Sequence, residues 1–198
     1  MTPLQTLYDF YLNDVRGCTF TLGLRALRMA AQDFCERTRA WKVKLPVQLA
    51  VAGQSDYLFA PDADMRIVRT ISATIDGRDA PLLMPEQAGP GAHGILVHDE
   101  RSFTVYPALA AGQKIVFLCA VKPSHTASSI DDALFDRYGR AIGIGAKAEL
   151  YGMKQQPFSD MDAALDERGR FEVEIMKAIT NVGRASNSAP IRVKANMM

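Results

Sequence analysis

The stretch ALRMAAQDFCERTRAWKVKLPVQLAV, residues 26–51, changes its hydrophobic period at Trp41. Before Trp41 the apolar residues recur at three- and four-residue steps, which is typical of one face of an α-helix. After Trp41 they alternate with polar or small residues, which is typical of a half-buried β-strand. The pattern therefore predicts that the chain leaves a helical region and enters a strand-rich region at this residue.

Helical periodicity occurs at both ends of the chain. Residues 1–42 are predicted to form a helix pair that divides near Gly17, and two more helices are predicted over residues 129–152 and 159–181. Hydroxyl side chains that can accept the first backbone N–H groups precede three of these helices. These predicted N-caps are Thr19 or Thr21, Ser128 or Ser129, and Ser159.

The middle of the chain reads as short strands that Gly, Pro and Asp residues separate. The longest alternating runs are residues 65–75 and 114–121, and Asp76-Gly77 is a strong turn signal. The run at 43–51 is predicted to pair with residues 56–59 across a short turn. Strands and helices do not alternate, so a parallel nucleotide-binding sheet is not expected.

These patterns predict an α+β fold in which both chain ends build one helical bundle. The bundle combines residues 1–42 with residues 126–181, and residues 43–125 form an inserted antiparallel domain, a sandwich or barrel-like structure. Residues 182–198 show no periodic pattern and are predicted to form an extended C-terminal arm.

Composition excludes several classes of protein. The 198 residues are 48% hydrophobic and 23% charged, which is typical of a globular domain. A formal net charge of +1 argues against binding nucleic acid through bulk charge alone. The three cysteines lack the spacing of a disulfide framework or zinc site, and no apolar run is long enough to span a bilayer. The N-terminus lacks the features of a signal peptide, so a soluble protein made in the cytoplasm is expected.

Two groups of residues in the helical regions invite a functional interpretation. Small residues on the predicted third helix indicate very close packing, either between helices or between copies of the protein: Gly139, Gly143, Gly145 and Ala146. Basic residues on and just after the second helix are either a solvated face or positions at an interface or DNA channel: Arg25, Arg28 and Arg39.

The C-terminal arm carries a third candidate group. Its basic and apolar residues are typical either of an unstructured terminus or of a segment that becomes ordered on a partner by adding a strand or filling a groove. The candidate partner-binding residues of this arm are Arg184, Pro190, Ile191, Arg192, Val193 and Lys194.

No pattern in the chain predicts catalysis, a cofactor site or a metal site. Residues 143–148 match a loose G-x-G-x-x-A string, but a polar helical segment and no strand precedes it. His93 and His98 lie near acids without metal-ligand spacing. His125 lies near serines without a G-x-S-x-G turn. A protein that is not an enzyme is expected, and a small hydrolase that uses His98 or His125 remains the weaker alternative.

Four strings in the chain resemble a known family. Residues 26–41 resemble the helix pattern ALRxAAxxFCxxTxxW of the head–tail adaptor, or connector, proteins of tailed bacteriophages. Further similar strings are VAGQSDY at 51–57, IDG at 75–77 and IGIGA at 142–146, so the resemblance extends over residues 3–180.

The resemblance implies a structural virion protein without a cofactor. Copies of the subunit, commonly about twelve, would form a ring below the portal protein at the head–tail junction. The helices would line or surround the channel through which genomic DNA passes without sequence-specific binding. The β domain would face the tail or nozzle protein, the arm would reach toward the portal, and no membrane would be involved. The protein would be made in the host cytoplasm. Another tail-machine subunit, such as a tail-completion or nozzle protein, is the nearest alternative.

Overall fold

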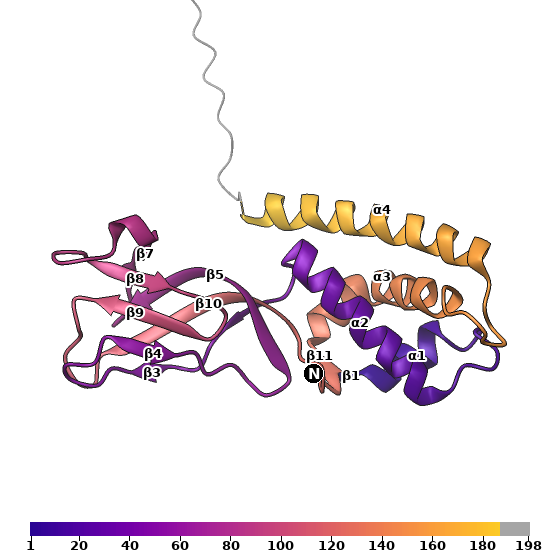
Figure 1. The fold of residues 1–198 in the computed structure, drawn as a ribbon, viewed down its shortest axis with the longest axis horizontal. Coiled ribbons are helices and arrows are strands. Elements are labelled where there is room, and N and C mark those ends of the chain that lie inside the picture. The colour runs from indigo at the N-terminus through magenta and orange to yellow at the C-terminus, as the bar shows by residue number, and fades with distance from the viewer. Residues whose placement is uncertain (187–198) are drawn as a thin grey trace, which may run out of the picture.

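The α-helices lie at one end of the molecule and most strands at the other in the computed structural model, which describes residues 1–186 (Figure 1). The predicted α+β class is confirmed. The helical part contains α1 (Leu4–Tyr11), α2 (Phe20–Thr38), α3 (Asp132–Tyr151) and α4 (Met161–Ser186). The β part contains the strands β2 to β10, which lie between α2 and α3 in the sequence.

The helical part is held together by contacts that involve both ends of the chain. Helix α2 packs against α1, α3 and α4, and α3 also packs against α1 and α4. Phe34 of α2 is fully buried, with its ring centroid 5.0 Å from that of Tyr138 on α3 and 6.3 Å from that of Phe171 on α4. The apolar stripe of α2 therefore forms the centre of this core.

A short sheet that the sequence did not reveal links the N-terminus to the segment directly before α3. Strand β1 (Thr2–Pro3) pairs antiparallel with β11 (Ser129–Ile130), directly before α3. The Leu4 N–H donates to the Ser128 carbonyl at 2.9 Å, and the Thr2 hydroxyl donates to the Asp132 carboxylate at 2.6 Å. Two-residue strands leave no readable alternation, so the sequence pattern could not predict them.

The N-cap residue of α2 is Thr19, as predicted, although its side chain makes no capping hydrogen bond. The observed N-caps of α3 and α4 differ from the predicted ones by one to three residues. The Asp131 carboxylate accepts the backbone N–H groups of Ala133 and Leu134 at 2.9 and 3.3 Å, and so caps α3. Ser128 and Ser129 cannot cap α3 because they take part in the contacts of β1 and β11. At α4 the capping side chain is that of Asp160, which accepts the Ala163 N–H at 3.0 Å, and not that of Ser159.

Replacing the α3 cap should weaken the fold measurably. We expect Asp131→Ala to lower the free energy of unfolding by about 1 kcal/mol, because two backbone donors lose their acceptor. Asp131→Asn should stay close to wild type, since asparagine caps helices about as well as aspartate. Urea unfolding followed by circular dichroism measures both variants, and an unchanged midpoint for Asp131→Ala would contradict this role.

The β part consists of two sheets. The first contains β2 (Lys42–Lys44), β10 (Lys114–Pro123), β5 (Met65–Ile75) and β6 (Arg78–Ala80), with β3 (Gln48–Leu49) also paired to β10. The second contains β4 (Asp56–Leu58), β9 (Ser102–Tyr106), β8 (Gly94–Val97) and β7 (Leu82–Leu83). Its β7–β8 pair is parallel and every other strand pair is antiparallel. Among the described residues no sheet closes into a barrel.

Aromatic rings join the two sheets. Phe103 of β9 and Phe117 of β10 have ring centroids 4.6 Å apart, and Phe59 lies 4.8 and 4.9 Å from these two rings. All three side chains are buried. These aromatic contacts form the β-part end of one hydrophobic core, which also includes Phe34.

The predicted pairing of residues 43–51 with residues 56–59 is wrong. Strands β2 and β3 both pair with β10, whereas β4 pairs with β9 in the other sheet. Pro46 divides the run into two short edge strands, since proline supplies no N–H to a ladder. The turn that follows carries the chain to the other sheet, where the Tyr57 hydroxyl donates to the Gln54 carbonyl at 3.0 Å.

Helix α4 is longer than predicted. It continues to Ser186, so residues 182–186 are helical and the predicted arm boundary at residue 182 is wrong. Val182 lies four residues after the buried Ala178 and extends the same helical face, which explains the continuation. Arg184 is therefore a helical residue. The other proposed arm residues lie outside the described part of the chain: Pro190, Ile191, Arg192, Val193 and Lys194.

Candidate functional site

A cavity of about 530 Å³ lies in the β part, and two of its lining residues, Lys122 and His125, contact α2 side chains. Buried or half-buried apolar side chains, including Phe59 and Ile67, form part of its wall. The ionisable side chains that line it are Arg66, Arg101, Lys122 and His125, together with the single acid Glu100. Positive groups thus outnumber negative ones here, although the whole chain carries a formal charge of only +1.

Strand pairing brings two of these cations together. Arg66 on β5 and Lys122 on β10 are direct cross-strand partners, just beyond an irregularity in the register between Ala120 and Val121. Like charges opposite each other destabilise a sheet, so packing alone does not favour this pair. Lys122 is neutralised by Glu36 of α2 at 2.8 Å. The exposed Arg66 forms no ion pair with any residue in the described part of the chain.

A tight turn positions the third cation. The Asp99 carboxylate accepts the backbone N–H groups of Arg101 and Ser102, each at 2.7 Å, between β8 and β9. These hydrogen bonds lower the pKa of the Asp99 carboxyl below its ordinary value, so the acceptor stays ionised at neutral pH. The Arg101 carbonyl in turn accepts the Phe59 N–H at 2.8 Å. The exposed Arg101 side chain forms no ion pair within residues 1–186.

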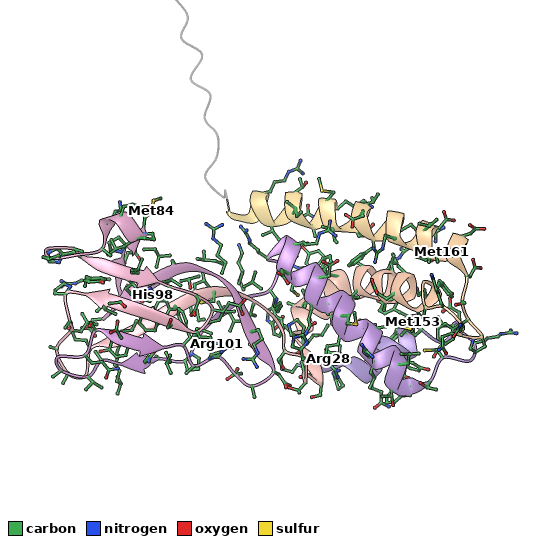
Figure 2. The ribbon with its side chains drawn as sticks, in the orientation of Figure 1. Arg28, Met84, His98, Arg101, Met153 and Met161 are labelled. Atoms are coloured by element: carbon green, nitrogen blue, oxygen red, sulfur yellow. The ribbon has the colours of Figure 1, made fainter. Side chains whose placement is uncertain are left out.

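One face of α2 borders this cavity through the segment that follows β10. Arg28 Nε donates to the Ala127 carbonyl at 2.8 Å. Gln32 Nε2 donates to the Pro123 carbonyl at 3.0 Å and lies 3.4 Å from His125 Nδ1. Figure 2 labels Arg28 and Arg101 on the two sides of this junction. The hydrogen bonds and the Lys122–Glu36 pair connect the β part to the helical part along α2.

The three basic residues predicted from the sequence have different environments. Arg28 is half-buried and structural, whereas Arg25, one turn earlier on the same face, is exposed. Arg39 is exposed at the far end of α2, where it has the left-handed φ of 54° of a helix C-cap. None of these three residues lines the cavity, although Arg28 contacts the segment that follows β10. The cavity cations were missed because their proximity depends on strand register and a turn, which leave no local sequence signal.

This arrangement suits the binding of phosphate groups. Arginine and lysine side chains are the usual donors to phosphate oxygens, and unpaired exposed ones can bind without first breaking an ion pair. Arg66 and Arg101 line the cavity and meet that condition among the described residues. The site can therefore contact a polyanion at a few points, without the large positive surface of a tight nucleic-acid binder.

The small residues of α3 contact the protein's own helices. A Cβ atom on Gly143 would lie 2.6 Å from Tyr11 Cβ, and one on Gly145 would lie 2.8 Å from the Phe171 ring. Gly139 lies against Tyr11 as well, and Ala146 is fully buried. The predicted helix packing thus occurs within one chain. A contact between subunits must use other residues.

His98 and His125 have hydrogen-bonding neighbours within the fold. His98 Nε2 lies 2.7 Å from the buried Thr104 hydroxyl, which donates to the Asp56 carboxylate. No three potential metal ligands group together within the described residues. The G-x-G-x-x-A string lies inside α3 rather than at a helix N-terminus, so it presents no free backbone N–H groups to a phosphate.

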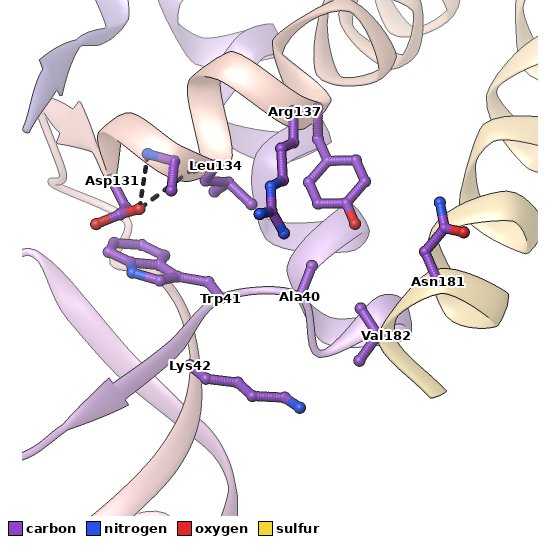
Figure 3. A pocket seen from close by; sticks show the side chains of 10 residues that line it. Ala40, Trp41, Lys42, Asp131, Leu134, Arg137, Asn181 and Val182 are labelled. Atoms are coloured by element: carbon purple, nitrogen blue, oxygen red, sulfur yellow. Dashed lines mark hydrogen bonds between the residues drawn. The ribbon is translucent and has the colours of Figure 1, made fainter. Parts of the chain in front are cut away.

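A second cavity, of about 250 Å³, lies between the start of α3 and the end of α4 (Figure 3). Trp41, Leu134, Tyr138 and Val182 line it, together with Arg137 at its edge. Within the described chain, Trp41 Nε1 is the buried side-chain donor without a hydrogen-bond partner. This cavity separates the helix–strand junction from the last turns of α4.

Comparison with known proteins adds no assignment. Neither a scan against models of protein families nor a search of curated proteins finds a match for this chain. None of the helices within residues 1–186 has the length and hydropathy needed to cross a bilayer.

Proposed function

We propose that this protein is a structural virion subunit, the head–tail adaptor of a tailed bacteriophage. About twelve copies form a ring below the portal and join the capsid to the tail. The resemblance of residues 26–41 to the adaptor helix supports this function. A further support is the arrangement of the chain, in which an inserted β part adjoins a helical part built from both chain ends.

The observation that carries the proposal is the cationic cavity beside α2. A channel for genomic DNA has to attract phosphates weakly at a few points, because each neutralised phosphate adds binding and slows passage. A near-neutral chain has this property when two exposed arginines, Arg66 and Arg101, line one cavity and form no ion pair with any described residue. In the ring, this face lies toward the DNA axis and contacts the duplex without reading its sequence.

Two other protein partners complete the proposed junction. The portal protein binds one side of the ring, through the segment after α4, and the tail or nozzle protein binds the β part. The protein acts without a cofactor and without turnover. It is made in the host cytoplasm and is retained in the virion at the head–tail junction.

Binding to portal rings tests this assignment. We expect the purified protein to co-sediment with portal rings from its own phage in a ratio close to one copy per portal subunit. Portal rings that pellet without the protein at saturating concentration would contradict the assignment. They would favour the alternative of a tail-completion or nozzle protein, whose partners lie further down the tail.

Weak, salt-dependent DNA binding is the second test. We expect the double variant Arg66→Ala/Arg101→Ala to bind duplex DNA more weakly than wild type. The slope of log K against log salt should fall by about 1.8, as two lost phosphate contacts predict. Fluorescence anisotropy at several salt concentrations measures the slope.

A matched control removes the same charge elsewhere. Arg140→Ala/Lys154→Ala also deletes two exposed cations, from α3 and the loop after it. We expect this control to keep the wild-type slope. If both double variants lose binding equally, the interaction is non-specific and the cavity is not the DNA contact.

The hydrolase alternative rests on His125, which lines the cationic cavity. It predicts that the protein hydrolyses a phosphate ester and that His125→Ala abolishes this activity. His98→Ala tests the other histidine in the same assay. The adaptor proposal predicts that portal binding survives both substitutions.

A further inference from the structure

Helix α4 has two apolar faces. The inner face is buried against α2 and α3 through residues such as Phe171 and Ile175. At 100° per residue, a second group of apolar side chains forms a separate strip along the outside of the same helix. This outer strip consists of Met161, Leu165, Val173, Met176 and Ile179, which are between 41% and 64% exposed.

The position of α4 leaves this strip uncovered by the described chain. Figure 1 shows α4 at the edge of the helical part, with α2 and α3 on one side of it only. Figure 2 labels Met161 at the start of the strip. An apolar strip that runs the length of a helix is unusual on a monomer and marks an interaction surface.

Two glycines on the strip indicate that another helix approaches closely. A Cβ atom on Gly169 or Gly183 would meet nothing within 4 Å, so packing within the described chain does not explain them. Glycine destabilises a helix interior relative to alanine, which makes them unfavourable in an isolated chain. Around Gly169 the helix surface is hollowed into a depression of about 480 Å³ beside Val173. Such a depression can accept a side chain from a partner helix.

The charges beside the strip identify the partner. Asp162 and Asp166 lie near the start of α4, and Lys177 and Arg184 lie near its end. Asp162 and Arg184 are each 11 residues from Val173 (173 − 162 = 184 − 173 = 11). Two copies of α4 that cross antiparallel at Val173 therefore place Asp162 of each copy opposite Arg184 of the other. A parallel pair would place like charges together instead.

We propose that the outer strip of α4 binds the same strip of a second copy of this chain in antiparallel orientation. Helix α4 is about 39 Å long, so the contact extends over about seven turns. In this arrangement Met176 of each copy lies within one residue of the position opposite Gly169 of the other copy. The Met176 side chain fills the depression around that Gly169. The result is a two-fold symmetric dimer in which the apolar strips cover each other.

This dimer is distinct from the proposed ring. Ring closure needs head-to-tail contacts between two different surfaces, whereas the α4 contact uses one surface twice. The dimer is therefore the state of the free subunit before assembly. The inference does not depend on the adaptor function, since it rests only on the surface of α4.

Sedimentation velocity of the full chain tests the dimer. Between about 1 and about 100 µM we expect a shift from monomer to dimer, as a micromolar dissociation constant predicts. Val173→Asp should raise that constant at least about tenfold, because two carboxylates meet at the two-fold axis. The control Val51→Asp adds the same charge at a similarly exposed valine in the β part and should leave the constant unchanged.

Charge exchange tests the orientation. Asp162→Arg and Arg184→Asp should each weaken the dimer, and the double variant should restore it. A chain that stays monomeric at about 100 µM, or a dimer that Val173→Asp leaves intact, would overturn the proposal. A dimer without rescue in the double variant would overturn the antiparallel arrangement.

Discussion

Trp41→Ala should lower the free energy of unfolding by about 3–5 kcal/mol, as large-to-small core substitutions do. Trp41 is 3% exposed and lies directly between α2 and β2, where the helical period of the sequence ends. Its carbonyl accepts the Val121 N–H at 2.9 Å, so the backbone at this point also connects β10. Removing the indole leaves a void at the junction of the two parts, beside the cavity that Leu134 and Tyr138 line.

Trp41→Phe separates the contribution of the ring from that of its N–H group. Because Trp41 Nε1 has no hydrogen-bond partner in the described chain, phenylalanine loses packing area but no hydrogen bond. We expect a smaller loss than for alanine, because phenylalanine keeps an aromatic ring at the junction and leaves a smaller void. Both variants lack the single tryptophan of the chain, so their unfolding in urea cannot be followed by tryptophan fluorescence. Circular dichroism is suitable for both. If the alanine variant unfolds at the wild-type midpoint, Trp41 is peripheral to the fold.

Gly143→Ala should be destabilising by about 1–3 kcal/mol, which is the usual range for overpacking a core. The added methyl group would lie 2.6 Å from Tyr11 Cβ, which is close to the backbone of α1. A rotation of the tyrosine ring cannot relieve that contact, so α1 itself has to move away from α3. This loss outweighs the gain of about 1 kcal/mol that alanine brings to a helix interior.

Gly169→Ala is the matched control for this prediction. Gly169 also lies inside a helix, but nothing in the described chain is within 4 Å of the added methyl group. We expect this variant to gain about 0.5–1 kcal/mol at protein concentrations that keep the chain monomeric. Equal effects of the two substitutions would show that Gly143 is not a close-packing position.

Local periodicity was sufficient to predict the helices and the strand-rich region between them. The stripe around Phe34 and the alternation after Trp41 depend on neighbouring residues, so each could be predicted from the sequence. The Asp76-Gly77 turn was also correctly predicted, because positive φ angles of 48° and 79° favour these two residue types. The predicted caps of α3 and α4 were displaced because several polar residues near each of these helix starts can cap equally well.

Long-range relations could not be predicted from the sequence. The pairing of β4 with β9 depends on where the turn after residue 51 leads, and no local rule determines that. The cationic cavity depends on the register of β5 against β10, which places Arg66 opposite Lys122. The glycines of α3 were assigned to close packing either between helices or between copies of the protein, and only the structure shows that they contact Tyr11 and Phe171 of the same chain.

Electron cryomicroscopy of portal rings incubated with this protein tests the proposed function most directly. We predict one additional ring of about twelve subunits on the tail-facing side of the portal, with α2 and the Arg66–Arg101 cavity toward the central channel. Portal rings without added density at saturating protein, or a bound ring whose cationic cavity faces outward, would contradict the adaptor assignment.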